Sequence, residues 1–208
     1  SNSDRYQYVF PSYNFAKNFY LDNISGGFNF NSYGTNTLRD TNIKTTSLFN
    51  DLEYSSFSTF LDNGVKTNFE IFLKNVNTAG KNNPQYEESP QSELMSAYTY
   101  NASLPMTKVT STNFNTLEPK LSLRLSPHDM KNNRTLERRI DINSIFNSNR
   151  LSMDDSFEGG ESITLGLNFR KEKINKIKDL SEIEDYIDFK LASVHRLSEE
   201  KNIPINST

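Results

Sequence analysis

Apolar and polar residues alternate along most of the chain. In the clearest stretch, residues 117–126, every second position is Leu or Pro, and the positions between them are Glu, Lys, Ser or Arg. Alternation with a period of two is typical of a β-strand with one apolar and one polar face. The same pattern recurs in residues 5–10, 28–31, 65–74, 97–101, 162–170 and 187–192. The sequence therefore predicts an all-β chain.

Turn-forming segments separate these runs: NISGG, YGTN, LDNG, NTAGKNNP and SPHDMKNN. Short connections favour hairpins, and no crossover helices separate the runs, so we expect an antiparallel up-and-down meander of roughly eight to ten strands. Many runs extend over about nine to eleven residues, the length that crosses a bilayer at a tilt. Two connections are expected to be long, Gly80–Ser92 and Ser126 to about Asn143.

One charged stretch, KEKINKIKDLSEIEDYI (residues 171–187), has a competing period. Its apolar residues Ile174, Ile177, Leu180 and Ile183 recur at every third position, as on one side of a helix. A charged hairpin is the preferred interpretation, and a short helix is the alternative.

The composition narrows the class of protein. Hydrophobic residues make up 34% of the 208 residues and aromatic residues 12%, with 10 Tyr, 15 Phe and no Trp. A polar chain this rich in large rings is either partly disordered or a β-architecture in which half of each strand faces water. The net charge of −3 gives no indication of nucleic-acid binding, and the absence of cysteine excludes disulfides and thiolate chemistry. No run is long enough for a transmembrane helix.

The two ends of the sequence suggest an internal piece of a longer protein. The first residues, SNSDRYQYVF, contain neither a start methionine nor the apolar region of a signal peptide, and the last, NIPINST, stop without a cap.

Candidate catalytic and metal-binding chemistry is sparse. His128 and His195 are the only histidines. No serine lies in a G-x-S-x-G motif or beside a histidine, so we expect neither histidine to have a serine nearby. The acidic residues Asp154, Asp155 and Glu158 lack the spacing of a calcium-binding EF-hand loop. We therefore predict no catalytic, cofactor or metal site, and a protein that is not an enzyme.

The acidic residues belong to FNSNRLSMDDSFEGGESITLGL, residues 146–167. We interpret this stretch as a loop that leads into a strand at residues 162–170. One cation, Arg150, lies near three carboxylates, so we predict that it pairs with Asp154, Asp155 or Glu158. The Gly159–Gly160 pair permits a sharp turn before the strand.

Several segments, in their order along the chain, resemble the β-barrel domain of the lipopolysaccharide (LPS)-assembly protein family (LptD, the organic solvent tolerance protein). They are RYQYVFPSYNF, GGFNFNSYGTNTLRDTN, NGVKTNFEIFLKNVN, TLEPKLSLRLSP, the stretch from residue 145 to 169 and DYIDFKLASVHRLSEEKNIP. In the stretch from residue 145 to 169 the matching positions are Asn149, Arg150, Ser152, Asp155, Glu158, Gly159, Gly160, Gly166 and Leu167. Met153 and Ser156 depart from the family, which usually has Gly and Arg at these positions.

The resemblance covers nearly the whole chain and implies a function without catalysis. Residues 1–208 would be a middle part of an outer-membrane β-barrel in a Gram-negative bacterium, with no jelly-roll domain and neither strand of the lateral gate. The family assembles LPS into the outer leaflet. The implied partners are LPS, membrane lipid, a plug lipoprotein like LptE, and a periplasmic LPS-bridge protein that acts through a domain outside this chain.

Two alternatives remain open at the level of sequence. One is another outer-membrane barrel, such as a porin or receptor, and the other is a soluble β-rich binding or adhesion module. A barrel wall predicts that Leu121, Leu123 and Leu125 share a lipid-facing surface with Ile163, Leu165, Leu167 and Phe169. The charged residues Glu118, Lys120 and Arg124 would then face a lumen, because a Lys or Arg at the bilayer midplane costs about 2–4 kcal/mol.

Overall fold

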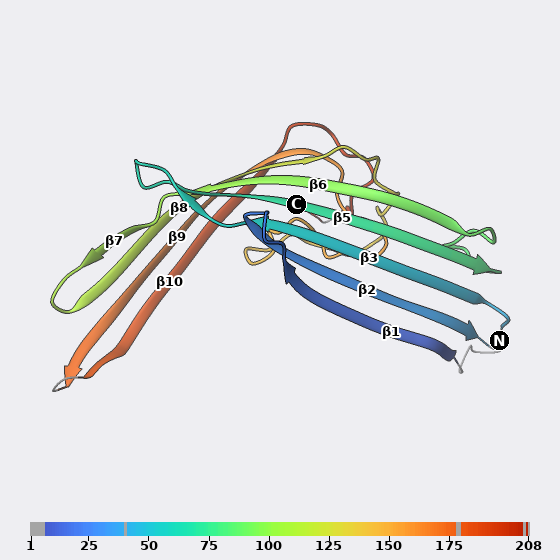
Figure 1. Ribbon diagram of the computed structural model, residues 1–208, viewed down its shortest axis with the longest axis horizontal. Helices are drawn as coiled ribbons and strands as arrows, with labels where there is room; N and C mark the ends of the chain where they lie inside the picture. The colour runs from blue at the N-terminus through green and yellow to red at the C-terminus, as the bar shows by residue number, and fades with distance from the viewer. Residues whose placement is uncertain (1–6, 40, 178–179, 206, 208) are drawn as a thin grey trace.

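The fold is a single antiparallel β-sheet that does not close on itself (Figure 1). The structure is a computed structural model that describes residues 7–39, 41–177, 180–205 and 207. Within these residues there are ten strands and no helix. The predicted all-β class and antiparallel meander are confirmed.

The strands follow the order of the chain. The main path through the sheet is β1-β2-β3-β5-β6-β8-β9-β10, while β4 pairs with β5 and β7 pairs with β8. The bounds are β1 Gln7–Tyr20, β2 Gly26–Arg39, β3 Lys44–Ser56, β4 Thr59–Phe60, β5 Lys66–Lys81, β6 Gln91–Ser103, β7 Met106–Val109, β8 Asn113–Ser126, β9 Gly160–Ile177 and β10 Leu180–Arg196. The eight strands of the main path have 13 to 18 residues, so they are longer than the expected nine to eleven.

The charged stretch at residues 171–187 forms a hairpin, and the alternative of a helix is wrong. Residues 178–179 lie outside the described residues, and strands β9 and β10 pair on both sides of them, with one register shift between Ile183 and Asp185. The pairing sets Lys173 opposite Asp185 and Arg170 opposite Asp188. Opposite charges directly across two antiparallel strands stabilise a sheet, so the acidic and basic residues support the extended form.

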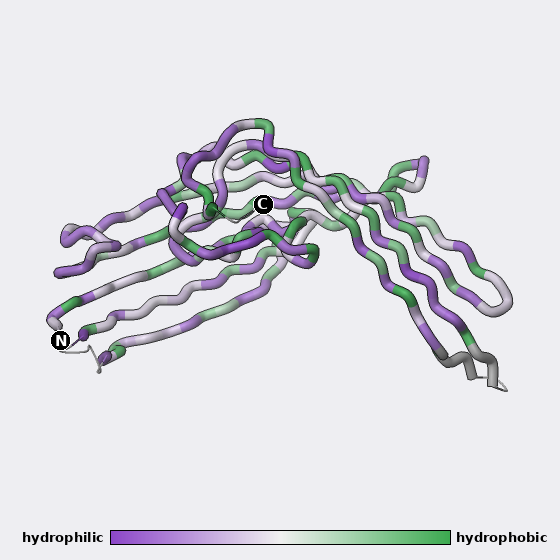
Figure 2. The backbone as a smooth tube through the Cα atoms, turned by 180° about the vertical axis from the view of Figure 1, so that it is seen from behind, coloured by the Kyte–Doolittle hydropathy of each residue, from purple (hydrophilic) through white to green (hydrophobic). Residues whose placement is uncertain are grey.

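The two faces of the sheet differ in what covers them. Residues directly opposite each other on paired strands share a face, and the register joins Leu121 to Leu165 and Leu123 to Ile163. We call this side the open face. The other side, with Glu118, Lys120 and Arg124 on β8, is the covered face. The predicted partition of these side chains is therefore confirmed, and Figure 2 shows the corresponding alternation of hydropathy along the strands.

The connection between β8 and β9, residues 127–159, packs on the covered face, and we call it the cover segment. It is longer than predicted, because the expected end near Asn143 is followed by further turns up to the first residue of β9, Gly160. Its residues Met130, Leu151, Met153 and Phe157 form the core with residues of β3, β5 and β6, namely Phe49, Phe72, Val76, Met95 and Ala97. The main apolar core thus lies between one sheet face and one connection.

The sheet narrows between β6 and β8. These strands pair only from Tyr98 to Ser103 on β6 and from Lys120 to Leu125 on β8. The first half of β8 pairs instead with the short strand β7. Figure 1 shows that β8, β9 and β10 run in a different direction from β1, β2 and β3, so the sheet turns at this narrow seam.

Candidate functional site

Several buried charges gather where the cover segment meets β8, β9 and β10. Arg150 binds Glu158 through two parallel hydrogen bonds, from Nε to Oε2 at 2.6 Å and from Nη2 to Oε1 at 2.7 Å. Both side chains are almost fully buried, with 1% and 2% of their surface exposed. The predicted ion pair of Arg150 is therefore confirmed, and Glu158 is its partner.

Two further arginines bind Glu158, one at its carboxylate and one at its backbone carbonyl. Arg196 at the end of β10 donates from Nε to Glu158 Oε1 at 2.6 Å. Arg124 donates from Nη2 to the backbone carbonyl of Glu158, also at 2.6 Å, and from Nε to the carbonyl of Ser148. We call Arg124, Arg150, Arg196 and Glu158 the arginine cluster. It fastens the cover segment to β8 through Arg124, to β9 through the bond from Arg150 Nη2 to Ser162 Oγ at 3.1 Å, and to β10 through Arg196.

The arginine cluster determines the charge state of its carboxylate. Burial opposes the ionisation of Glu158, but the hydrogen bond and charge of Arg150, together with the charge of Arg196, outweigh it and lower the pKa of Glu158. Two guanidinium nitrogens, Arg124 Nη1 and Arg196 Nη2, are buried without a hydrogen-bond partner. The cluster is therefore rich in positive charge, and Glu158 is the acidic group that it depends on.

The other acidic residues of the loop have separate partners. Asp155 accepts hydrogen bonds from Tyr86 Oη at 3.2 Å and Gln85 Nε2 at 3.3 Å, in the connection between β5 and β6. The backbone carbonyl of Asp154 accepts from Lys74 Nζ at 3.0 Å. Lys74 is fully buried and also pairs with Asp51 on β3. Each acidic residue of the loop thus contacts a different part of the covered face or its rim.

The glycine pair and its neighbours set the shape of the loop. Gly160 has φ of 80°, in the left-handed region that favours glycine, and a Cβ on Gly159 would lie 2.6 Å from the carbonyl oxygen of His128. The predicted reason for the pair, a sharp turn before the strand, is confirmed. Asn149 closes a second turn by donating from Nδ2 to the carbonyl of Met153.

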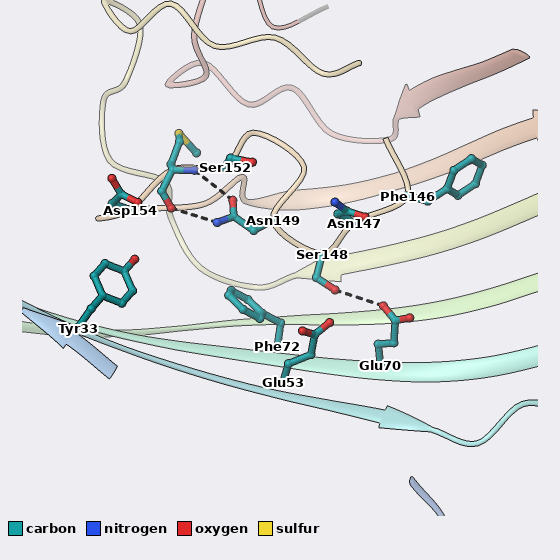
Figure 3. A pocket seen from close by; sticks show the side chains of 11 residues that line it. Tyr33, Glu53, Glu70, Phe72, Phe146, Asn147, Ser148, Asn149, Ser152 and Asp154 are labelled. Atoms are coloured by element: carbon teal, nitrogen blue, oxygen red, sulfur yellow. Dashed lines mark hydrogen bonds between the residues drawn. The ribbon is translucent and has the colours of Figure 1, made fainter. Parts of the chain in front are cut away.

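A polar trough lies beside the cover segment on the covered face. One cavity of about 520 Å³ is lined by Tyr33, Glu53, Glu70 and Phe72 from the sheet and by residues 146–149 and 152–154 of the cover segment. Figure 3 shows Glu53, Glu70 and Phe72 rising from the strands toward Ser148, whose hydroxyl donates to Glu70 Oε2 at 3.4 Å. A second cavity of about 300 Å³ shares Glu70, Phe146 and Asn147 with the first.

The second cavity extends this trough along β5, β6 and β8. Its lining includes Asn68, Asn101, Glu118 and Lys120. The Oδ1 of Asn101 is buried without a hydrogen-bond partner. The trough therefore presents amide, carboxylate and ammonium groups along the covered face, beside the rings of Phe72 and Phe146.

Both histidines lie next to a serine, which the sequence analysis did not anticipate. Ser126 Oγ is 2.9 Å from His128 Nδ1, and Ser193 Oγ is 3.2 Å from His195 Nε2. The expectation that neither histidine has a serine nearby is therefore wrong, because residues two apart on an extended chain point to the same side. The other ring nitrogen of His128 bonds the carbonyl of Phe157 at 3.0 Å. Ser126 is only 1% exposed and also donates to the carbonyl of Ser96.

These serine–histidine pairs do not form a catalytic triad. In the described part of the chain, neither imidazole makes a hydrogen bond to a carboxylate. Nor does any group of three or more His, Asp or Glu side chains among the described residues have the arrangement of a metal site. His128 instead connects the end of β8 to the cover segment.

His128 predicts a pH dependence of stability. Burial lowers its pKa, partly offset by the Phe157 carbonyl, while the charge of Arg124 lowers it further. The unfolded chain binds a proton near pH 6.5, so this contribution to stability is complete above that pH and is lost as the pH falls toward the folded pKa. We expect the midpoint temperature of thermal unfolding to decrease as the pH is lowered from about 7.5 to about 5.5. The His128→Gln substitution should make this decrease smaller.

The matched control for this measurement is His195→Gln, since His195 is exposed on the open face. Its pH dependence should follow that of the unmodified protein. An equal flattening by both substitutions would contradict a specific role for His128.

The strongest contacts of the arginine cluster could be predicted only in part. Arg150 and Glu158 are 8 residues apart, and their charges alone suggested a pair. Arg196 and Arg124 are 38 and 34 residues from Glu158, and only the pairing of β8, β9 and β10 brings them to it. The alternation on β8 and β5 placed Arg124 and Lys74 on the covered face, but no signal in the sequence pointed to their partners or to Arg196.

Comparisons with known proteins do not assign the chain to a family. No family model matches the chain, and no curated protein matches its sequence. Among the described residues, no helix is long and apolar enough to cross a membrane. The function is therefore inferred from the two faces of the sheet and from the motif resemblance.

Proposed function

We propose that this chain is a wall segment of an outer-membrane β-barrel that assembles lipopolysaccharide into the outer leaflet. The open face would contact lipid, and the covered face would line the lumen. LPS, membrane lipid, a plug lipoprotein like LptE and a periplasmic LPS-bridge protein are the proposed partners, and the proposed site is the outer membrane of a Gram-negative bacterium.

The observation that carries this proposal is a diagonal stripe of large apolar side chains on the open face, which we call the apolar band. It contains Phe15, Phe19, Phe28, Phe30, Leu52, Tyr54, Phe69, Ile71, Leu73, Tyr98, Tyr100, Leu117, Leu121, Leu123, Leu125, Ile163, Leu165, Leu167, Phe169, Phe189 and Leu191. Many of these side chains are exposed, among them Leu123, Leu165 and Leu191 at 42%, 49% and 58%. On β1 the exposed side chain of Lys17 interrupts the band between Phe15 and Phe19. An exposed apolar surface that extends over the other strands of the main path is uncommon on soluble proteins.

The direction of the apolar band matches tilted strands in a bilayer. One hydrogen-bonded row of the sheet joins Phe19, Phe28, Tyr54, Ile71, Tyr98 and Leu125. The centre of the apolar band coincides with this row on β5 but moves away from the row on later strands, to Leu121 on β8 and to Phe189 on β10. Between β1 and β10 the centre of the band moves about ten residues along the strands relative to the row, over seven steps from one strand to the next. Each step therefore moves the band about 4.7 Å along the strands for about 4.8 Å across them.

A shift of this size corresponds to an angle of about 45° between the band and the hydrogen-bonded rows. Strands of outer-membrane barrels tilt by about 35–45°, so a level membrane would cross this sheet along such a diagonal.

The edges of the sheet also fit a wall segment. On the main path, β1 and β10 each have a strand neighbour on one side only. Both carry exposed apolar side chains, such as Tyr13 and Phe15 on β1 and Ile187 and Phe189 on β10. Unpaired backbone groups are costly in lipid, so we propose that further strands of the same barrel continue from both edges.

Support for LPS as the cargo comes from the ordered motif resemblance and from the covered face. Of the motif residues, Arg150 donates to Ser162 on β9 and Glu158 accepts from Arg196 on β10, so they hold the cover segment against the sheet. Asn149 and the Arg150–Glu158 pair shape the cover segment itself. The trough beside it is polar and lies opposite the apolar band. An amphipathic molecule whose sugars pass along a lumen requires such a polar wall.

The experiment uses photo-cross-linking residues in the full-length protein in cells. One replaces Leu123 in the apolar band and the other replaces Asn101 in the trough. We expect adducts with lipid acyl chains at Leu123 and adducts with LPS at Asn101. Absence of any lipid adduct at Leu123 would refute the membrane wall, while lipid at Leu123 without LPS at Asn101 would point to a different outer-membrane barrel.

A further inference from the structure

The arginine cluster contains more positive than negative charge. Its three arginines contribute three positive charges and Glu158 contributes one negative charge, so two positive charges remain uncompensated within the cluster. The carboxylate of Glu158 binds Arg150 and Arg196. Arg124 binds two backbone carbonyls instead, those of Ser148 and Glu158. Among the described residues, the guanidinium of Arg124 therefore has no direct acidic partner.

Arg124 is also deeply buried. It is 5% exposed, and its guanidinium lies over the ring of Phe157, with Cζ 5.8 Å from the ring centroid. A buried charge without a counter-charge destabilises a folded protein strongly. The face of an aromatic ring offsets part of this cost but supplies no full negative charge. We therefore expect a compensating anion close to Arg124.

The guanidinium of Arg124 has hydrogen-bond donors left over. Arginine has five N–H donors in a planar group, and Arg124 uses Nε and Nη2 for the two carbonyls. Its third nitrogen, Nη1, is buried and has no hydrogen-bond partner among the described residues. In the planar group Nη1 lies on the side opposite the Nε–H. It is therefore directed away from the carbonyl of Ser148.

The register of the sheet shows what lies on either side of Arg124. On β9 the opposite residue is Ser162, whose hydroxyl accepts from Arg150 Nη2 at 3.1 Å. On β6 the opposite residue is Thr99, which is 2% exposed. The hydroxyl of Thr99 has no hydrogen-bond partner in the described part of the chain. The Cβ atoms of directly opposite residues are about 4.5–5.5 Å apart, so Arg124 and Thr99 carry unused donors side by side.

Two acidic side chains of the neighbourhood bind other groups. Glu70 lies opposite Thr99 on β5, so its backbone is two strand spacings, about 9.6 Å, from that of Arg124. The carboxylate of Glu70 accepts from Asn68, Asn101 and Ser148. Glu200, which follows β10, accepts from the backbone N–H of Asn202. Both carboxylates thus bind uncharged groups.

The occupant of this position has to be small. Ser148 binds Glu70 on one side of Thr99 and Arg124 on the other, so the cover segment spans Thr99. A side chain of a partner protein or a phosphate group cannot reach a position closed in this way. A monatomic anion such as chloride is close to a water molecule in size and accepts several hydrogen bonds. Water would satisfy the donors but would leave the charge of Arg124 uncompensated.

We propose that Arg124 and Thr99 bind a halide ion beneath the cover segment, through the Nη1 of Arg124 and the hydroxyl of Thr99. The ion compensates the charge of Arg124, whose other nitrogens hold the carbonyls of Ser148 and Glu158. Halide binding therefore stabilises the attachment of the cover segment to β6 and β8. The site requires only the fold and is independent of the proposed membrane wall.

The test measures how halides affect the attachment of the cover segment in the purified full-length protein. Proteolysis of residues 127–159 is followed while sodium chloride replaces sodium gluconate at constant ionic strength, because gluconate is too large for the buried position. We expect saturable protection, with cleavage about tenfold slower when the chloride concentration is about ten times its dissociation constant. Bromide should protect as well, and its anomalous scattering in a crystal should give a peak between Arg124 and Thr99.

Two threonine substitutions then locate the site. Thr99→Val keeps the shape of the side chain but removes the hydroxyl, so the dissociation constant for chloride should rise about fivefold to tenfold. Thr78→Val is the matched control, since Thr78 is also buried on the covered face, near the other end of β5. It should leave the chloride dependence unchanged.

Several results would overturn the proposal. Equal cleavage in chloride and gluconate would mean that only water occupies the position. Chloride protection that is the same in Thr99→Val and Thr78→Val would place the ion elsewhere, as would a bromide peak distant from Arg124. The bromide peak is measured in the unmodified protein, so it decides the matter even if Thr99→Val weakens the fold.

Discussion

Glu158→Gln should destabilise the protein by about 3–5 kcal/mol, the usual effect of removing one partner from a buried ion pair. Glutamine keeps the shape of the side chain but removes the negative charge to which buried Arg150 and half-buried Arg196 are bound. The cover segment should then detach from β8, β9 and β10. The decisive measurements are the free energy of unfolding and the protease sensitivity of residues 127–159.

Glu161→Gln is the matched control, since Glu161 is exposed and lies three residues from Glu158 on the same segment of chain. We expect it to change the free energy of unfolding by less than about 0.5 kcal/mol. Similar losses from both substitutions would contradict the central role of Glu158.

The same carboxylate makes the protein sensitive to acid. Because the folded pKa of Glu158 lies below its unfolded value, its stabilisation is complete above the unfolded pKa, near pH 4.3, and is lost as the pH falls through the folded pKa. This loss should occur at lower pH than the loss due to His128, and it should disappear in the Glu158→Gln variant.

Leu165→Arg should impair insertion into the outer membrane, with a cost of about 2–4 kcal/mol if the residue lies near the bilayer midplane. Leu165 is in the apolar band, directly opposite Leu121, and is 49% exposed. A guanidinium placed there would lose its hydration and would have no carboxylate nearby to compensate its charge. The measurement is the fraction of full-length protein assembled in the membrane, together with its unfolding in detergent or lipid.

Asn168→Arg is the control on the same strand. Asn168 faces the covered side opposite Glu118, where a charge remains in a polar environment. Normal assembly of this variant beside a defective Leu165→Arg protein is the expected result. Equal tolerance of both arginines would favour a soluble protein over a barrel wall.

The strands and the partition of their side chains could be predicted from sequence because a period of two follows directly from backbone geometry. Residues 117–126 and 162–169 alternate without interruption, so their faces were evident before their pairing was known. The hairpin at residues 171–187 was less clear, since its isoleucines also recur at a helical spacing. Opposite charges across β9 and β10 decide between the two.

The cover segment could not be predicted in the same way. It has no regular period, and its core residues Met130, Met153 and Phe157 find their partners on β5 and β6, far away in the sequence. Met153 was noted only as a departure from the family motif, yet it is 2% exposed and part of the core. Contacts of this kind depend on the completed sheet, so no local pattern announces them.

The narrow seam between β6 and β8 has a consequence for how the sheet opens. Strands β6 and β8 pair only over Tyr98–Ser103 of β6 and the residues of β8 opposite them. The strands up to β6 and the strands from β8 onward therefore form two blocks, and most contacts lie within one block or the other. Each block can protect its own amides from hydrogen exchange, and the blocks can separate before either unfolds. Phe157 and Met153 pack on the first block while the arginine cluster ties them to the second. Cooperativity between the two blocks is therefore carried mainly by a connection, and loss of that connection would divide one folding transition into two.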